Sequence, residues 1–113
     1  MENMELIKKA LKGVVHETRG STGSRARVKG ISVAGKTGTV QVIGLKKTEA
    51  LEEEGEIPVK FRDHAWFVAI APAEDPALAL AILVEHAGEG GSRVAAPIAK
   101  KMFEAYLGKE LDV

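Results

Sequence analysis

The chain has 113 residues, 45% of them hydrophobic and none of them cysteine. This is enough apolar material for one small domain with a core, which argues against intrinsic disorder, and the lack of cysteine excludes disulfides and thiolate chemistry. Sixteen basic residues balance sixteen acidic ones, so the chain lacks the net positive charge on which non-specific nucleic-acid binding depends.

The first segment, residues 3–18, is predicted to be an amphipathic helix. Met4, Ile7 and Leu11 recur at helical spacing with lysines between them, and the pattern continues to Val15. A Gly-Ser-Thr-Gly sequence ends this helix, and a polar, basic stretch follows up to residue 30.

Residues 31–43 are predicted to form a strand, because β-branched Ile, Val and Thr residues dominate this stretch. Residues 44–62 then carry many Lys and Glu side chains and are too long for a tight hairpin. We expect this segment to be a charged, mobile surface loop.

Two apolar runs, residues 64–71 and 77–85, are joined by turn-forming residues and predict an antiparallel hairpin. Both runs are expected to be buried on both faces. Because adjacent strand residues point to opposite faces, at least one of Trp66 and Phe67 should lie in the core.

Glycines at 88, 90 and 91 precede Ser92, a suitable N-cap for a final helix that is expected to end at Gly108. Its predicted inner face consists of Ile98, Met102, Phe103 and Tyr106. The sequence therefore predicts an α+β fold, with a three-stranded antiparallel sheet flanked by N- and C-terminal helices, over residues 1–113 as one unit.

Residues 30–39 match two unrelated catalytic signatures. Residues 30–37 fit the phosphate-loop pattern GxxxxGK[ST], and Lys36-Thr37-Gly38-Thr39 fits the motif of penicillin-recognising enzymes. A phosphate loop requires a strand before it and a helix starting near Lys36, whereas β-branched residues come after the motif here. We therefore favour a strand and keep a nucleotide-binding protein as the less favoured alternative.

Within a strand, Thr37 and Thr39 present their hydroxyl groups on one face, while Lys36 and Gly38 lie on the other. Two hydroxyls with a nearby ammonium suit the binding of a carboxylate beside a reacting amide. Gly38 avoids a side chain where packing is close, and a strand N–H group is suited to stabilising an oxyanion.

The order of elements around this motif resembles the C-terminal part of a penicillin-binding transpeptidase domain. More narrowly, residues 38–45, 62–64 and 67–72 resemble class B enzymes of the penicillin-binding protein 2 type, which act in cell-wall elongation and cell shape. The resemblance covers nearly the whole chain and implies the β-lactamase-like transpeptidase fold, whose sheet usually has five strands.

The resemblance implies a peptidoglycan D,D-transpeptidase in which a serine is acylated by a stem peptide and is trapped by β-lactams. By motif, Lys36 would support the proton network and electrostatic field of the nucleophile, and Thr37 and Thr39 would bind the substrate carboxylate. Thr39 N–H would form half of the oxyanion hole, so Lys36 and Thr39 are the candidate catalytic residues, and Gly38 would keep the strand clear for substrate.

Two further motifs of that family are absent from this sequence. None of its serines has a lysine three positions later, and no Ser-x-Asn is present. We therefore expect a C-terminal fragment of the transpeptidase domain that is inactive alone, with the remainder of the domain missing and one sheet edge open to self-association. The competing hypothesis is a non-catalytic binding or interaction module of the same fold.

The sequence predicts no cofactor and no metal site, and the three histidines are interpreted as structural. No apolar run approaches the ~20 residues of a membrane span. The resemblance implies a full-length parent anchored in the bacterial inner membrane, with this domain on its outer, periplasmic side.

Overall fold

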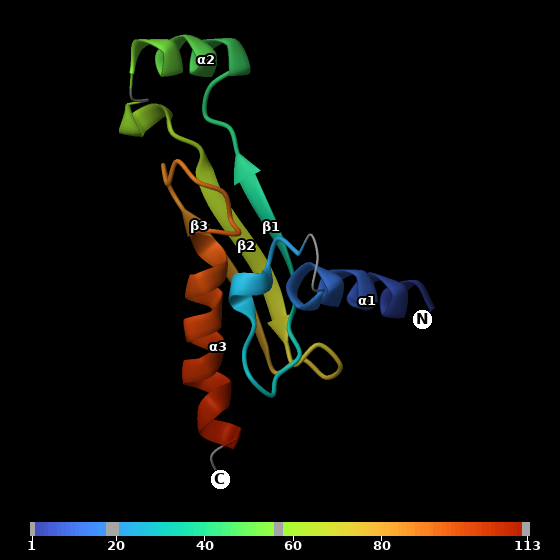
Figure 1. The fold of residues 1–113 in the computed structure, drawn as a ribbon. Coiled ribbons are helices and arrows are strands. Elements are labelled where there is room, and N and C mark those ends of the chain that lie inside the picture. Colours follow the sequence, from blue (N-terminus) through green and yellow to red (C-terminus); the bar gives the residue numbers. More distant parts are fainter. Residues whose placement is uncertain (1, 18–20, 56–57, 112–113) are drawn as a thin grey trace.

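The computed structural model describes residues 2–17, 21–55 and 58–111. The predicted α+β fold is confirmed: a three-stranded antiparallel sheet lies between an N-terminal and a C-terminal helix, and one further helix stands at the end of the sheet (Figure 1). In chain order the elements are α1 (Glu2–His16), the 3-10 turn η1 (Ser24–Ala26), β1 (Ala34–Val40), α2 (Leu45–Glu54), the 3-10 turn η2 (Val59–Phe61), β2 (His64–Ala71), β3 (Leu78–Val84) and α3 (Ala95–Leu111).

Strand β2 lies between β1 and β3, and both pairings are antiparallel. Its side chains alternate strictly: Ala65, Phe67, Ala69 and Ala71 are buried, and the residues between them are partly exposed. Directly opposite residues of paired strands share a face, so this alternation defines a core face and an outer face for the whole sheet.

The core lies between the core face of the sheet and α3, and the C-terminal end of α1 closes it. Phe67, Phe103, Val15 and Val33 are its largest fully buried side chains. Phe67 is completely buried while Trp66 is only partly buried, so the prediction that these neighbours face opposite sides is confirmed.

The prediction that both faces of the hairpin are buried is wrong for β3. Along this strand, half-buried residues alternate with exposed ones, and Leu83 is 58% exposed. In the described part of the chain nothing covers the outer face at this strand, so only its core-facing residues pack. The continuous apolar run of β3 therefore includes exposed apolar side chains.

The predicted inner face of α3 was also wrong, except for Phe103. Ile98, Met102 and Tyr106 are 39%, 44% and 53% exposed. The helix has a second stripe at the same spacing, and its small alanines bring the helix close to the sheet. The helix also continues beyond Gly108 to Leu111, since one glycine costs a helix only about 1 kcal/mol relative to alanine and need not end it. The residues of the buried stripe are Ala95, Ala96, Ala99, Phe103 and Leu107.

Helix α1 and strand β1 form where they were predicted but are shorter. Helix α1 ends at His16, and residue 18 of the predicted helix lies outside the described residues. Met4 and Ile7 are exposed and only Val15 is fully buried, because α1 extends away from the sheet toward its N-terminus (Figure 1). Before β1, residue 31 makes only an isolated bridge with Val28.

The predicted loop of residues 44–62 contains helix α2 and the turn η2, which corrects that prediction. The helix is rich in Leu, Lys, Glu and Ala, which all favour helix, and Thr48 N–H donates to the carbonyl of Gly44 in its first turn. Lys47 and Lys60 both lie over the ring of Phe61, at 4.5 and 5.0 Å from its centroid. Cation–π contacts therefore connect α2 to η2.

The turn between β2 and β3 is tied to two other segments through Glu74. The Glu74 carboxylate accepts hydrogen bonds from Lys12 of α1 and from the hydroxyl of Ser32, just before β1. Ala73 N–H donates to the carbonyl oxygen of Ser32 at 2.9 Å. These hydrogen bonds, from Lys12 first and then from Ser32, lower the pKa of Glu74 from 4.5 to about 2.

We expect this lowered pKa to appear as acid sensitivity. A carboxyl with a depressed folded-state pKa stabilises the fold above its unfolded pKa, and that contribution is lost as the pH falls from about 4.5 to about 2. Urea unfolding from pH 6 to pH 2 should show the stability difference between wild type and Glu74→Gln shrinking over this interval. Glu104→Gln, at an exposed position of α3, should follow the wild type. A Glu74→Gln difference that is constant with pH would contradict this assignment.

Candidate active-site strand

The Lys36–Thr39 motif lies within strand β1, as the sequence predicted. β-branched Thr37, Thr39 and Val40 favour an extended backbone here. No helix begins at Lys36, so the structure lacks the helix start that a phosphate loop requires. The strand lies at the edge of the described sheet and pairs with β2 alone, so its outer edge faces away from the other strands.

The register of β1 and β2 separates the motif onto two faces. Thr37 is directly opposite Phe67 and therefore shares the core side of the sheet, where Thr39 also lies. Lys36 and Gly38 are opposite Val68 and Trp66 on the outer face. Thr37 is half-buried and Thr39 is exposed, so both hydroxyl groups lie at the border between the core and the surface.

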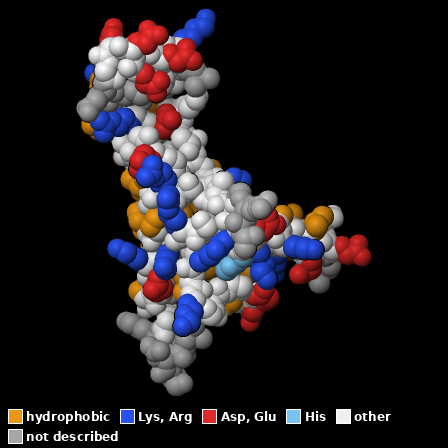
Figure 2. All heavy atoms as spheres, viewed as in Figure 1, with side chains coloured by type: hydrophobic (Ala, Val, Ile, Leu, Met, Phe, Trp, Pro, Cys, Tyr) orange, Lys and Arg blue, Asp and Glu red, His pale blue; other side chains and the backbone are white. Residues whose placement is uncertain are grey.

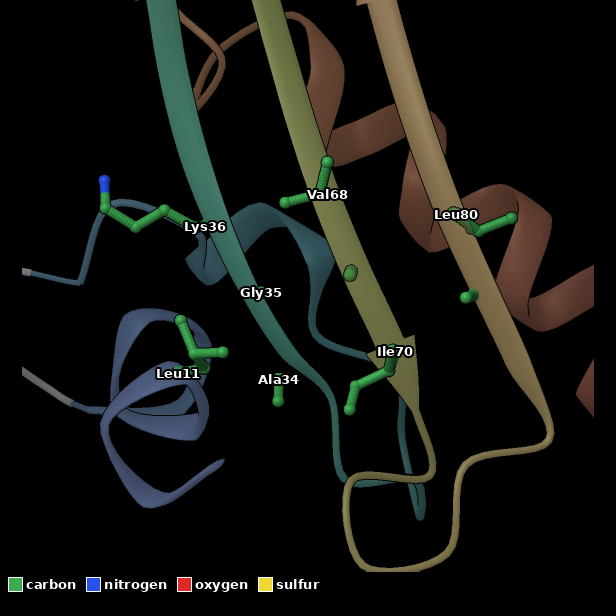
Figure 3. Close-up of a pocket in the computed structure, with 9 residues that line it drawn as sticks. Leu11, Ala34, Gly35, Lys36, Val68, Ile70 and Leu80 are labelled. Atoms are coloured by element: carbon green, nitrogen blue, oxygen red, sulfur yellow. The ribbon is translucent and has the colours of Figure 1, made fainter. Parts of the chain in front are cut away.

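Lys36 is exposed at the rim of an apolar groove of about 220 Å³ on the outer face. Figure 3 shows its side chain extending from β1 away from the other strands, while Leu11 of α1 and Ile70 of β2 border the groove on opposite sides. Lys36 Nζ donates a hydrogen bond to the carbonyl of Thr37 at 2.9 Å. The ammonium is therefore held beside the strand, where it can reach a group bound at this edge.

Gly38 is enclosed from both faces of the sheet. A Cβ atom at this position would overlap the indole ring of Trp66 on the outer face. From the other direction, Gly91 packs so closely that its own Cβ would overlap the carbonyl oxygen of Trp66 and lie 3.0 Å from the carbonyl oxygen of Gly38. The absence of a side chain at 38 is thus required by the protein's own packing.

The glycine-rich turn after β3 also reaches Thr39, because a Cβ at Gly90 would lie 3.0 Å from the Thr39 hydroxyl oxygen. On the neighbouring loop, the hydroxyl groups of Thr22 and Thr37 are hydrogen-bonded at 3.1 Å. Sequence reasoning did not assign Thr22, Trp66 or Gly91 to the site. The only signals were the Gly-Ser-Thr-Gly linker and the glycine cluster, which predicted turns and carried no information on what those turns touch.

The start of β1 is joined to the end of α1 by His16. Its Nε2 accepts a hydrogen bond of 2.9 Å from the Val33 N–H, just before the strand. Burial first, and then the positive charges of Arg27 and Lys12, lower the pKa of His16. The neutral ring that this bond requires is therefore favoured. Arg27 also donates from Nε to the Val15 carbonyl at 2.6 Å, which caps the C-terminal end of α1.

Within residues 2–17, 21–55 and 58–111, no group of three or more His, Asp or Glu side chains is arranged to hold a metal ion. His64 and His86 are nevertheless neighbours, with ring centroids 4.6 Å apart. His64 Nδ1 accepts from the His86 N–H at 2.8 Å, so this contact connects the start of β2 to the end of β3.

Comparison with known proteins defines the class of this chain. The family model for the penicillin binding protein transpeptidase domain matches residues 1–104. The chain therefore belongs to the penicillin-binding transpeptidase family, and the predicted fold, with its motif strand at the sheet edge, is part of that domain's fold.

Within the family, the relatives are of the penicillin-binding protein 2 type, which confirms the resemblance found in the sequence. The chain is 38% identical over 107 residues to the peptidoglycan D,D-transpeptidase MrdA of Haemophilus influenzae, covering 95% of this chain and 16% of MrdA. It is 36% identical over 90 residues to the D,D-transpeptidase PbpA of Mycolicibacterium smegmatis, covering 76% of this chain and 16% of PbpA. The chain thus spans about a sixth of the length of these relatives.

Solved structures agree with this placement. Pseudomonas aeruginosa PBP2, solved in complex with WCK 5153, matches with a TM-score of 0.66 and 35% identity, over 88% of this chain and 18% of that one. Helicobacter pylori PBP2, solved in complex with MreC, matches with a TM-score of 0.65 and 28% identity, over 94% of this chain and 18% of that one.

Proposed function

We propose that this chain supplies the substrate-carboxylate and oxyanion strand of a peptidoglycan D,D-transpeptidase. The observation that carries the proposal is the Lys36–Thr39 motif on an edge strand, with an exposed ammonium and two hydroxyl groups at the core border. In this role Thr37 and Thr39 bind the terminal carboxylate of a stem peptide or the carboxylate of a β-lactam, and Thr39 N–H donates to the oxyanion.

Lys36 supplies positive charge near the nucleophile and takes part in proton transfer there. The nucleophile itself is a serine on another part of the enzyme, since this sequence has no Ser-x-x-Lys. Because Gly38 has no side chain, Trp66 and Gly91 can pack against the strand from its two faces. The missing side chain also leaves space beside the strand for the substrate. The proposal requires no cofactor.

We expect the chain alone to form no acyl adduct with a β-lactam. Intact-protein mass spectrometry after incubation with ceftriaxone should show only the unmodified mass, because the acylated serine is absent. Penicillin-binding protein A of Mycobacterium tuberculosis, solved as an acyl-enzyme complex with this class of drug, is the positive control. A stoichiometric ceftriaxone adduct on this chain would show that it holds a nucleophile of its own.

A non-catalytic binding module of the same fold is the second candidate, favoured by the absence of the two serine motifs from this sequence. The two functions differ in what the strand does when the rest of a transpeptidase domain is present. If the function is catalytic, the Lys36–Thr39 strand supports acylation of the serine that the rest of the domain supplies. If the chain is a binding module, the strand does not support this acylation.

We further propose that the full-length parent is anchored in the bacterial inner membrane with this domain on the outer side. The relatives support its place in cell-wall synthesis, since they are peptidoglycan D,D-transpeptidases. Over the residues that the structure describes, no helix combines the length and the hydropathy of a membrane span.

The open edge of β3 leads us to propose that the isolated chain pairs with a second copy. Among the described residues β3 pairs only with β2, and its sequence Leu-Ala-Leu-Ala-Ile-Leu-Val has no charge to oppose edge-to-edge pairing. Sedimentation equilibrium should show a concentration-dependent dimer, which Ala81→Lys on the exposed side of β3 weakens. Ala105→Lys, at an exposed alanine of α3, should leave it unchanged. A monomer at all concentrations would contradict this pairing.

A further inference from the structure

A polar hollow of about 360 Å³ lies beside the motif strand, between the loop after α1 and the segment that leads into α3. All of its lining residues are polar, and none is acidic. They comprise four hydroxyl side chains and one guanidinium: Ser21, Thr22, Ser24, Ser92 and Arg25. Such a lining offers hydrogen-bond donors and one positive charge, which together suit a small anion.

Two hydrogen bonds connect the walls of this hollow to each other and to the motif strand. Arg25 Nη1 donates to the carbonyl of Ser92 at 3.3 Å, so the loop is joined to the segment before α3. Thr22 Oγ1 is 3.1 Å from Thr37 Oγ1. The hydroxyl that lines the hollow is thus in direct contact with a hydroxyl of the substrate strand.

The stretch of sequence that contains the first wall of the hollow is also basic. Every charged residue between positions 18 and 48 is Lys or Arg. On the face of the molecule drawn in Figure 2, Lys and Arg side chains lie over the middle, whereas acidic side chains gather mainly over α2 and α1. Arg25 is exposed at the hollow, and its hydrogen bond to Ser92 uses one of five guanidinium N–H donors. The planar guanidinium presents paired N–H groups that match the two oxygens of a carboxylate.

We propose that Arg25, together with the hydroxyl groups of Thr22 and Ser24, forms a carboxylate-binding subsite beside Thr37. The subsite rests on the proposed function, because it extends the carboxylate-recognition surface of Thr37 and Thr39 along the same side of β1. It takes a carboxylate of the peptide substrate, either the terminal one that reaches Thr37 or another carboxylate of the same peptide.

A nuclear magnetic resonance titration of the whole chain with sodium acetate tests the subsite directly. At constant ionic strength, balanced with sodium chloride, acetate should shift the amide signals of Thr22, Arg25 and Ser92 in a saturable manner, and neutral acetamide should not. Arg25→Gln should weaken acetate binding about tenfold, since a charge-assisted pair is lost. Arg93→Gln is the matched control, because Arg93 is exposed next to Ser92, does not line the hollow and pairs with Glu89.

Thr22→Val provides a second variant that removes one hydroxyl with little change in volume, and it should also weaken acetate binding. Absence of saturable shifts, equal shifts with acetamide, or unchanged affinity in both Arg25→Gln and Thr22→Val would overturn the subsite.

A parallel titration with N-acetyl-D-Ala-D-Ala separates the subsite from the proposed function. Dipeptide shifts at Thr37 and Thr39 in the absence of any saturable acetate binding in the hollow would overturn the subsite and support the substrate strand. Acetate binding in the hollow without any dipeptide effect on Thr37 and Thr39 would support the subsite and count against the proposed function. If the affinity for the dipeptide falls in Arg25→Gln, its terminal carboxylate is the group bound. If only acetate binding falls, the subsite takes a different carboxylate of the peptide.

Discussion

Phe67→Ala is expected to destabilise the chain by about 4 kcal/mol, which is a large part of the stability of a small domain. Phe67 is completely buried at the centre of the middle strand and belongs to the same core cluster as Phe103 of α3. The ring also lies against β1, because a Cβ at Gly35 would be 2.7 Å from its Cζ atom. Removing the ring leaves a cavity that the strands on either side cannot close without shifting.

Urea unfolding followed by circular dichroism measures this loss, and Tyr106→Ala is the aromatic control. Tyr106 is 53% exposed on α3, so its truncation should cost much less than that of Phe67. Similar losses for the two variants would contradict the assigned core.

Gly38→Ala is expected to destabilise the chain by about 2 kcal/mol, through overpacking against the indole ring of Trp66. The added methyl group would overlap the indole of Trp66, and Gly91 prevents β1 from retreating toward the other face. Since the three atoms nearest to that methyl group all belong to the Trp66 side chain, shortening this side chain should relieve the overlap.

A double-mutant cycle with Trp66→Leu tests this explanation. The cost of Gly38→Ala in the Trp66→Leu background should be smaller than in the wild type by about 1 kcal/mol or more. Gly108→Ala is the control, because it has nothing within 4 Å and lies in helix α3, where alanine is favoured. If the losses of stability caused by Gly38→Ala and Trp66→Leu are additive, contact with Trp66 is not the reason why position 38 requires glycine.

Local patterns in the sequence were sufficient for the parts of the fold that local chemistry decides. β-branched residues around Thr37 predicted the strand, and strand alternation correctly predicted that Trp66 and Phe67 face opposite sides of the sheet, with at least one of them in the core. The choice between a phosphate loop and a strand depended on the residues before Gly30 and directly after Lys36, together with the order of predicted helices and strands.

The errors arose where two patterns of equal regularity competed or where no apolar stripe was present. In α3 the bulky stripe of Ile98, Met102 and Tyr106 has the same period as the alanine stripe, and only the distance between helix and sheet decides which one is buried. In α2 the charged residues suggested a loop, although their individual propensities favour a helix.

The surroundings of the motif strand could not be predicted because they depend on contacts between distant segments. Thr22 reaches Thr37 across fifteen positions of the sequence. Gly91 meets Gly38 only because the hairpin folds back on β1. A glycine in a sequence indicates a turn or a close approach but does not name the partner.

The central claim is that the Lys36–Thr39 strand serves a transpeptidase whose nucleophile lies elsewhere, and a chimeric enzyme tests it most directly. In Haemophilus influenzae MrdA, the segment that matches this chain would be replaced by residues of this chain, and acylation by a fluorescent penicillin would be followed with the unaltered MrdA in parallel. We predict that the folded chimera is labelled and that Lys36→Ala in the chimera abolishes labelling. A folded chimera that stays unlabelled while MrdA is labelled, or labelling that survives Lys36→Ala, would contradict the account.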